Sequence, residues 1–275
     1  ASLNAYGHLG PWARRPGHEQ LAQASTGMQQ RYGGDGTPAV QPYPVNDFGT
    51  GFLGAYAVAL ALLHRARTGQ GQQVDTALAY TAGTLQSLFM QDYAGKRWDE
   101  ARGQESLGTG PLNRAYRARD GWLFLALPAA RRAALDRVEG LAGVTALDGA
   151  ALESALETAL TTEAVATWVT RLNVAGIGAH RVVFDVRELL EDPWAQTHGL
   201  SITRDHEGWG PITTTGPTMR LSLTPVVPGC PAPRPGADTR SILAEVGLAD
   251  RIDELILAGA IVTEGVEALI SQAVR

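Results

Sequence analysis

The 275-residue sequence has one cysteine, one lysine and no long apolar run, and each of these shortages limits the structures or binding sites that we expect. Because Cys230 has no second cysteine to pair with, an internal disulfide is excluded, which fits a reducing compartment. Lys96 is the only lysine, so arginine or backbone N–H groups would hold an anionic ligand. The longest apolar run, residues 55–63, is too short to cross a bilayer, which needs about 20 residues.

Acidic residues outnumber basic ones, and the apolar content is that of an ordinary globular protein. The formal net charge is −5, with 44% hydrophobic and 19% charged residues. An acidic surface disfavours nucleic acid or an anionic membrane as a partner, and the N-terminus lacks the pattern of a secretory signal. We therefore expect a cytoplasmic protein, with no nucleic acid and no membrane among its partners, that buries a sizeable core in one large or two small domains.

The positions of the polar residues do not support two common kinds of site. The six histidines are scattered, and none stands at metal-ligand spacing from another histidine, a cysteine or an acid, so we expect no metal. No glycine pattern follows a strand in the way that a dinucleotide site requires. The sequence also lacks the Gly-x-Ser-x-Gly motif that is typical of serine hydrolases.

Apolar spacing and turn residues predict the order of the elements. A helix begins near residue 46 or 47 and stops at the glycines of 69–71, a strand covers 73–78, and a second helix covers 80–93. This order is typical of α/β proteins. The other predicted elements are a helix near 19–30, a hairpin over 114–127, helices at 129–141, 150–160 and 163–173, a strand at 181–184, a short helix at 186–191, two strands within 200–223, and helices at 238–246, 252–258 and 264–274.

One carboxylate combines a helix start with glycine-rich surroundings. Residues 45–51 read Val-Asn-Asp-Phe-Gly-Thr-Gly, which places Asp47 at the beginning of an alanine-rich helix. Free N–H groups and the macrodipole at a helix start favour an ionised carboxylate, and Gly49 and Gly51 let a bulky substrate approach. These features suit a carboxylate nucleophile or base. On the residues alone, the simpler interpretation is favoured, an N-cap at Asn46 or Asp47.

Several short motifs follow one another along essentially the entire chain. They are 6–12 (Tyr-Gly-His-Leu-Gly-Pro-Trp), 17–28 (Gly-His-Glu-Gln-Leu-Ala-Gln-Ala-Ser-Thr-Gly-Met), 46–51, 64–75 (His-Arg-Ala-Arg-Thr-Gly-Gln-Gly-Gln-Gln-Val-Asp), 116–122, 192–194 and 233–236. In this order they resemble the family III CoA-transferases, which include formyl-CoA and carnitine CoA-transferases and the related α-methylacyl-CoA racemases.

The resemblance implies an α/β fold, with a Rossmann-like large domain present in part, a smaller α+β domain, and assembly as an interlocked dimer. Residues 1–107 and 201–275 would then belong to the large domain and 108–200 to the small one. The family normally begins with a segment that supplies much of the CoA pocket, and this sequence starts near the end of that segment. Either a complementing N-terminal-half chain or the same precursor supplies it, or the chain is an incomplete piece, so the CoA-binding residues stay unassigned.

The resemblance also implies roles for individual residues. Asp47 matches the catalytic aspartate, which takes the acyl group from an acyl-CoA as an anhydride, carries CoA as a thioester, and passes it to a carboxylate. Gln23 resembles an active-site glutamine that would donate a hydrogen bond to the developing oxyanion. Gly108, Thr109 and Gly110 correspond to a glycine loop that covers the intermediates and excludes water. Acyl-CoA and carboxylic acids are then the substrates, and no bound cofactor is implied.

Two alternatives stay open. The racemases of the family use an opposed histidine and aspartate to move an α-proton, and His18 falls where that histidine would lie opposite Asp47. On the residues alone, His18 is a lone histidine in a polar loop, which is usually just solvated, and the residues 23–27 favour the transferase. The third interpretation is a non-catalytic subunit that contributes an interface to a catalytic partner.

Overall fold

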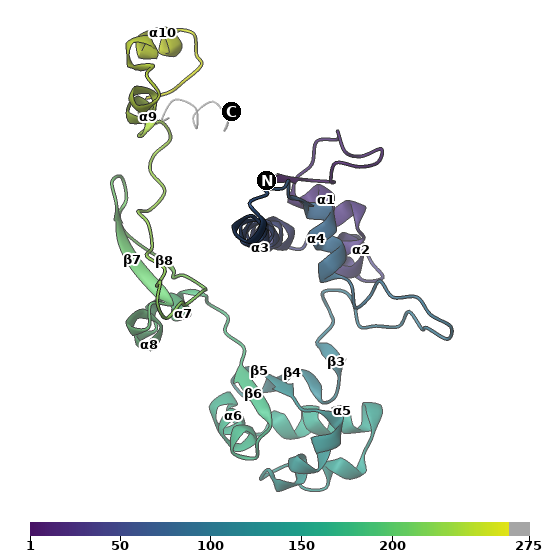
Figure 1. Ribbon diagram of the computed structural model, residues 1–275. Coiled ribbons are helices and arrows are strands. Elements are labelled where there is room, and N and C mark those ends of the chain that lie inside the picture. The colour runs from purple at the N-terminus through teal and green to yellow at the C-terminus, as the bar shows by residue number, and fades with distance from the viewer. Residues whose placement is uncertain (264–275) are drawn as a thin grey trace. The chain divides into compact units, whose positions relative to one another are not determined.

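The chain divides after Val182 into two units in the computed structural model, which describes residues 1–263 (Figure 1). Each unit has its own strands and helices. The boundary does not coincide with either of the predicted domain limits. The grouping of 1–107 with 201–275 in one domain, and of 108–200 in another, stays a prediction.

The first part of the chain consists of helices beside one short pair of parallel strands. Strand β1 (Ser2–Asn4) pairs with β2 (Asp75–Ala77), and Leu3 stands opposite Thr76. The helices are α1 (Glu19–Ser25), α2 (Met28–Gly33), α3 (Val45–Thr68) and α4 (Leu78–Leu85). The parallel pair brings the beginning of the chain next to the segment that connects α3 to α4.

Two predicted helices in this part are shorter than their apolar spacing suggests. The helix predicted over 19–30 is interrupted at Gly27, which adopts a left-handed conformation with a φ of 82°. The helix predicted over 80–93 begins at Leu78 and ends at Leu85. The sequence does not predict β1, because three residues are too few to show an alternating pattern.

Helix α3 carries Asp47 in its first turn. The helix ends where the sequence predicts, at Gly69, which adopts a φ of 78° while its N–H bonds the carbonyl of Arg65. Its start differs, because Pro44 is the N-cap and Asn46 and Asp47 lie inside the helix. The N-cap interpretation is therefore wrong, since neither Asn46 nor Asp47 is the N-cap of α3.

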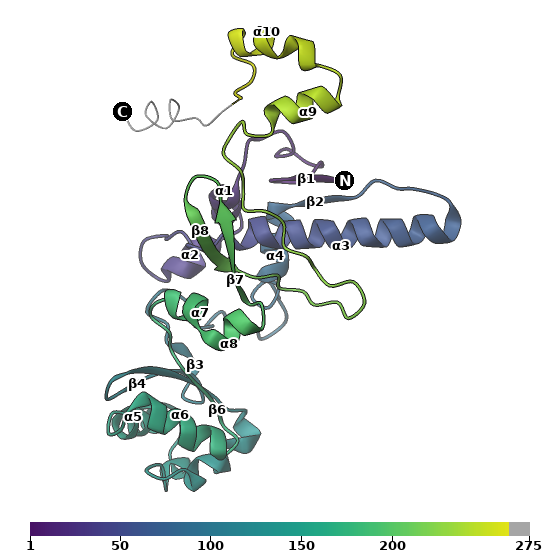
Figure 2. The same cartoon turned by 90° about the vertical axis from the view of Figure 1, so that its left-hand side faces the viewer.

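A single narrow stripe of α3 is buried within the described residues. Asn46, Thr50 and Gly54 form it, at the four-residue spacing of one helix face. Phe52 and Tyr56 are among the large apolar side chains that stay exposed on the other faces. Figure 2 shows the C-terminal half of α3 extending away from α1 and α4. By length and composition alone, α3 is long and apolar enough to cross a membrane, so the expectation drawn from the short apolar run of residues 55–63 does not hold by this criterion.

The next part of the chain folds around an antiparallel sheet with the strand order β3–β4–β5–β6. The predicted hairpin is confirmed, since Ala118 and Gly121 pair across its tight turn. The helices predicted at 150–160 and 163–173 are confirmed, whereas 3-10 turns replace the helix predicted at 129–141. The elements are β3 (Gly108–Gly110), β4 (Asn113–Ala118), β5 (Gly121–Ala126), the 3-10 helices η1 (Ala129–Arg137) and η2 (Val144–Ala146), α5 (Gly149–Leu160), α6 (Val165–Val174) and β6 (Gly178–Arg181).

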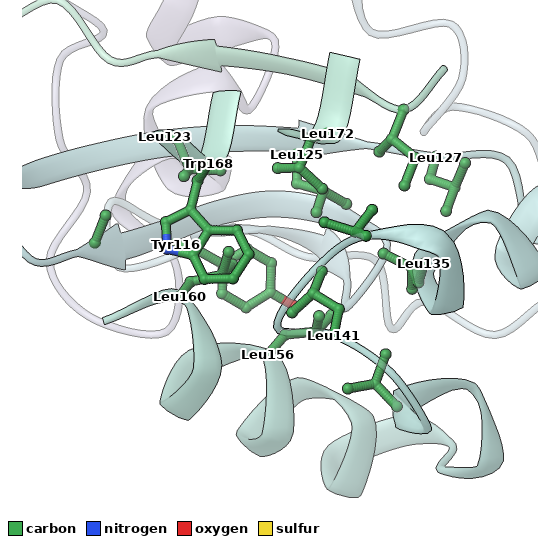
Figure 3. Packing of buried hydrophobic residues seen from close by; sticks show 14 of the residues in the cluster. Tyr116, Leu123, Leu125, Leu127, Leu135, Leu141, Leu156, Leu160, Trp168 and Leu172 are labelled. Atoms are coloured by element: carbon green, nitrogen blue, oxygen red, sulfur yellow. The ribbon is translucent and has the colours of Figure 1, made fainter. Parts of the chain in front are cut away.

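This sheet and its helices enclose an extensive apolar core. Tyr116 on β4 and Trp168 on α6 are fully buried in it, together with Leu156 and Leu160 of α5 (Figure 3). Burying one large apolar side chain contributes about 1.5–3 kcal/mol. The cluster therefore stabilises this part of the chain strongly, in contrast to the largely exposed α3.

The second unit consists of a hairpin with short helices before and after it. The two strands predicted within 200–223 are confirmed as an antiparallel pair. The helix predicted at 264–274 lies outside the described residues. The elements are α7 (Arg187–Glu191), α8 (Pro193–Thr197), β7 (Ser201–His206), β8 (Gly210–Thr215), α9 (Thr239–Glu245), η3 (Ala249–Arg251) and α10 (Ile252–Leu257).

The described residues thus have a mixed α/β fold with several separate sheets. Within residues 1–263, β1 and β2 form the one parallel pair, and the other pairings are antiparallel. The predicted α/β class is confirmed at this level. The Rossmann-like large domain and the interlocked dimer stay predictions.

Candidate active site

Asp47 is an exposed carboxylate at the third position of α3. The N-cap residue, Pro44, provides no side-chain cap, and the N–H groups of a first helical turn have no partner inside the helix. The partial positive charge at this end of a helix attracts anionic groups. An accessible, ionised carboxylate is the form that acts as a nucleophile or a base.

Asp47 and His18 line the same cavity, which has a volume of about 360 Å³. His18 precedes α1 and is exposed, and its Nδ1 lies 2.7 Å from Oε1 of Gln20. The fold therefore brings together the two residues that the resemblance pairs. The other lining residues come from the segment around β1, the end of the loop before α1, and the starts of α3 and α4, namely Leu3, Asn4, Ala5, Gly17, Thr50, Gly51 and Leu78.

The two glycines that follow Asp47 have different surroundings. A Cβ atom on Gly51 would meet nothing within 4 Å, so this glycine leaves the cavity open beside Asp47. A Cβ atom on Gly49 would lie 2.6 Å from Cγ2 of Thr81, on α4. Gly49 therefore allows α3 to pack closely on α4 and does not line the cavity of Asp47, and its role in admitting a substrate stays a prediction.

A second carboxylate, Glu19, is buried between the starts of α1 and α3. It is the first residue of α1 and is only 3% exposed. Its Oε2 accepts the backbone N–H of Asp47, with 2.8 Å between the two atoms. Its Oε1 accepts both Nδ2 of Asn46 and Nε2 of Gln23, each at 2.8 Å. Glu19 thus connects the elements that carry the predicted site residues.

Sequence reasoning does not find Glu19 as a residue of the site. An acid in the first turn of a helix is common, because the helix dipole stabilises it there, and such acids are normally solvated. Its burial depends on the docking of α3 against α1, which no local pattern reports. Its place directly after His18, in a motif that also contains Gln23, is the one available signal.

Gln23 is fully buried, and both ends of its amide are occupied. Its Nε2 donates to Glu19 and, at 3.1 Å, to the carbonyl of Gln41. Its Oε1 accepts the backbone N–H of Gln41 at 3.0 Å. A hydrogen bond from Gln23 to a substrate oxygen would require one of these contacts to open. The role of Gln23 as an oxyanion donor stays a prediction.

Gly108, Thr109 and Gly110 form strand β3 instead of the predicted loop. A Cβ atom on Gly108 would collide with the backbone of Asn113 and Arg114, so glycine is needed for β3 to approach β4. Gly108 and Gly110 line another cavity, of about 240 Å³, together with Arg114 and Glu153. Neither Asp47, His18, Glu19 nor Gln23 lines that cavity, and the covering role of this segment stays a prediction.

Arg114 is a buried cation beside β3, with 7% of the residue exposed. Burial alone would lower the pKa of Arg114, but its hydrogen bond and ion pair with Glu153 raise that pKa, with a further contribution from Glu157. The distance to Glu157 is 3.0 Å. The two glutamates of α5 thus match the charge of Arg114, which joins β4 to α5.

Comparison with known proteins identifies relatives of the chain. A model of CoA-transferase family III matches residues 1–239. The chain is 25% identical to the succinyl-CoA:glutarate CoA-transferase of Mus musculus over 94% of its own length and 63% of that protein. It is 33% identical to the α-methylacyl-CoA racemase of Homo sapiens over 127 residues, which are 44% of this chain and 32% of that protein.

Among solved structures, the chain resembles a CaiB/BaiF family protein from Brucella suis. The TM-score is 0.68 at 22% identity, over 89% of this chain and 66% of that one. At this identity the likeness shows the fold alone. The chain spans less than two-thirds of the length of the curated relatives that it matches.

Proposed function

The chain belongs to CoA-transferase family III, and we propose that it moves CoA from an acyl-CoA to a carboxylic acid through Asp47. One observation carries this proposal. Asp47 is an exposed carboxylate at the positive end of α3, in a cavity that it shares with His18. A carboxylate in that position can attack a thioester carbonyl carbon, because open space lies beside it.

The proposed reaction runs in four balanced steps. A carboxylate oxygen of Asp47 attacks the thioester carbonyl, the C–S bond breaks, and CoA leaves as a thiolate from an acyl-aspartyl anhydride. The thiolate attacks the aspartyl carbonyl, which releases the first carboxylate and leaves CoA as a thioester on Asp47. The acceptor carboxylate attacks this thioester and releases the thiolate again, and the thiolate attacks the acceptor's acyl carbon. The last step forms the new acyl-CoA and restores the Asp47 carboxylate.

The other predicted residues have supporting roles in this proposal. Gln23 stabilises the oxyanion of the tetrahedral intermediates once its contact with Gln41 opens. Gly108, Thr109 and Gly110 exclude water from the anhydride, which water would hydrolyse. Because these three residues form a strand, they would act as a fixed edge and not as a hinged loop.

The proposed substrates are an acyl-CoA and a carboxylic acid, and CoA enters as a substrate rather than as a bound cofactor. The mouse relative acts, by its name, on succinyl-CoA and glutarate. This supports the transfer of CoA from the thioester of one carboxylic acid to another carboxylic acid. We place the reaction in the cytoplasm, without nucleic acid or membrane. We further propose that the chain works as a homodimer or with a complementing N-terminal-half chain.

An α-methylacyl-CoA racemase is the second candidate, and the shared cavity of His18 and Asp47 is the observation that favours it. A histidine and an aspartate on opposite sides of a substrate could remove and return an α-proton. The identity to the human racemase, 33% over 127 residues, is consistent with this chemistry. A non-catalytic subunit, which contributes only an interface to a catalytic partner, is the third candidate.

Two assays on the protein, purified with any polypeptide that accompanies it, separate these candidates. The transferase proposal predicts that Asp47→Asn abolishes the exchange of CoA between two carboxylic acids. The racemase predicts that deuterium from solvent enters the α-position of a 2-methylacyl-CoA, and that His18→Ala stops it. A non-catalytic subunit predicts that both substitutions leave the activity intact, a result that would contradict the first two proposals.

A further inference from the structure

We propose that Glu19 is a positioning residue for Asp47, because its buried carboxylate holds the first turn of α3 in the orientation that presents Asp47 to the cavity. This inference rests on the proposed function, since positioning matters to catalysis only if Asp47 reacts. Glu19 itself does not line the cavity, whose wall includes its neighbour His18. Its effect therefore has to pass through the residues that it binds.

Both oxygens of Glu19 are used, and all of its described partners are N–H groups. The backbone N–H of Asp47 donates to Oε2, and the side-chain amides of Asn46 and Gln23 donate to Oε1, each at 2.8 Å. Taking a carboxylate out of water costs several kcal/mol unless it is well hydrogen-bonded. Three N–H donors on its two oxygens supply these hydrogen bonds, and two of the three come from the start of α3.

The start of α3 depends on this contact. The N-cap, Pro44, has no side-chain hydrogen bond to the helix, so the free N–H groups of the first turn need partners from elsewhere. Glu19 supplies one for Asp47 from a different helix. The contact lies at the same residue whose side chain enters the cavity, so it bears directly on the direction of that side chain.

Asn46 provides a second anchor next to the first. It is fully buried, and its Nδ2 donates to Glu19, whereas its Oδ1 has no hydrogen-bond partner among the described residues. The hydrogen bond to Glu19 therefore orients the Asn46 amide in a way that leaves its Oδ1 without a partner among the described residues. With Asn46 and the N–H of Asp47 both held, the peptide unit between them has little freedom to rotate.

Gln23 in turn holds Glu19 in place. Its amide donates to Glu19 and forms hydrogen bonds in both directions with the backbone of Gln41, in the segment that leads to Pro44. One turn further along α3, the hydroxyl groups of Thr50 and Thr81 lie 2.6 Å apart and fix the helix to α4. Two separate contacts therefore hold the N-terminal part of α3, namely those of Glu19 in the first turn and that of Thr81 with Thr50 one turn later.

These two anchors allow a matched pair of variants. Glu19→Gln keeps the size of the side chain but turns one acceptor oxygen into an NH₂ group, which faces N–H donors. A misplacement of about 1 Å can cost about 10²-fold in rate, so we expect single-turnover acylation of Asp47 to slow by about 10- to 100-fold. The KM for acyl-CoA should change much less, because the wall of the cavity is intact.

Thr81→Val is the control, since it removes the hydroxyl partner of Thr50 and leaves Glu19 untouched. We expect it to lower the melting temperature, as Glu19→Gln does, while the acylation rate of the folded protein stays within about twofold of wild type. Hydrogen exchange at the Asp47 amide provides a second readout that does not depend on activity. Exchange should accelerate in Glu19→Gln and stay unchanged in Thr81→Val.

The outcomes separate this inference from the proposed function. A wild-type acylation rate in Glu19→Gln overturns the inference, and so does equal slowing in Thr81→Val, which would indicate a general loss of structure. If the wild-type protein forms no adduct on Asp47, the proposed function fails. In that case hydrogen exchange at the Asp47 amide tests the inference without activity. Acceleration confined to Glu19→Gln supports the holding of Asp47 by Glu19, and unchanged exchange overturns it.

Discussion

The backbone N–H of Asp47 donates a hydrogen bond to the buried carboxylate of Glu19, with 2.8 Å between N and Oε2. The candidate nucleophile is thus held through its main chain, while its side chain lines a cavity with His18. The residue proposed to react is exposed, and the residue proposed to set its direction is buried. This division lets the two roles be tested by different substitutions.

Two alanine substitutions in α3 should change stability in opposite directions. Gly51→Ala adds a methyl group that meets nothing within 4 Å, and alanine is more favourable than glycine in a helix by about 1 kcal/mol. Gly49→Ala places its methyl group 2.6 Å from Cγ2 of Thr81 and should destabilise the protein by about 1–3 kcal/mol. Urea denaturation followed by circular dichroism measures both. Destabilisation by Gly51→Ala, or none by Gly49→Ala, would contradict the packing described for α3.

Arg114 should matter far more to stability than another arginine of the same strand region. Arg114→Met removes the partner of Glu153 and Glu157 from a buried position, and we expect a loss of about 2–3 kcal/mol. Arg119→Met is the control, because Arg119 is largely exposed and lies 3.9 Å from Glu163. Exposed pairs of this kind contribute about 0–1 kcal/mol. Equal losses of unfolding free energy in the two variants would show that Arg114 does not join β4 to α5.

Tyr116 should make the protein sensitive to alkaline pH. Burial raises the pKa of its hydroxyl group above the ordinary value, whereas the unfolded chain ionises this group at about pH 10. Above that pH the unfolded state releases a proton that the folded state keeps. Stability is therefore complete below about pH 10 and falls as the pH rises, by up to about 1.4 kcal/mol per pH unit.

Tyr116→Phe tests this dependence when the free energy of unfolding is measured between about pH 8 and 11. The variant should lose about 1 kcal/mol near neutral pH, because the hydroxyl donates to the carbonyl of Pro111 at 2.7 Å. Its stability should fall less steeply above about pH 10. Tyr56→Phe, at an exposed position of α3, should leave the slope unchanged. A wild-type slope in Tyr116→Phe would assign the alkaline sensitivity to other groups.

Local patterns predict the helices and hairpins well where the signal lies within a few residues. The end of α3 follows from Gly69, which accepts the left-handed conformation of a helix end. The tight turn before Gly121 follows from the Arg-Asp-Gly sequence of residues 119–121, which is typical of a hairpin turn. His18 and Asp47 line one cavity, and the roles that the family resemblance gives them stay predictions.

Features that depend on contacts between distant segments could not be predicted in this way. The burial of Glu19 and the close packing of Gly49 on Thr81 both require α3 to dock on other helices. Strand β1 exists only because β2 pairs with it. Gly108 has the composition of a loop, and its lack of a side chain in fact allows β3 to lie against β4.

The most direct test of the central claim is peptide mass spectrometry of the protein, purified with any accompanying polypeptide, after incubation with a panel of acyl-CoA thioesters and a hydroxylamine quench. Hydroxylamine converts an anhydride or thioester on an aspartate to a hydroxamate. We expect a hydroxamate on Asp47 in the wild type and none in Asp47→Asn. An unmodified Asp47 across the panel, or a hydroxamate on another residue, would contradict it.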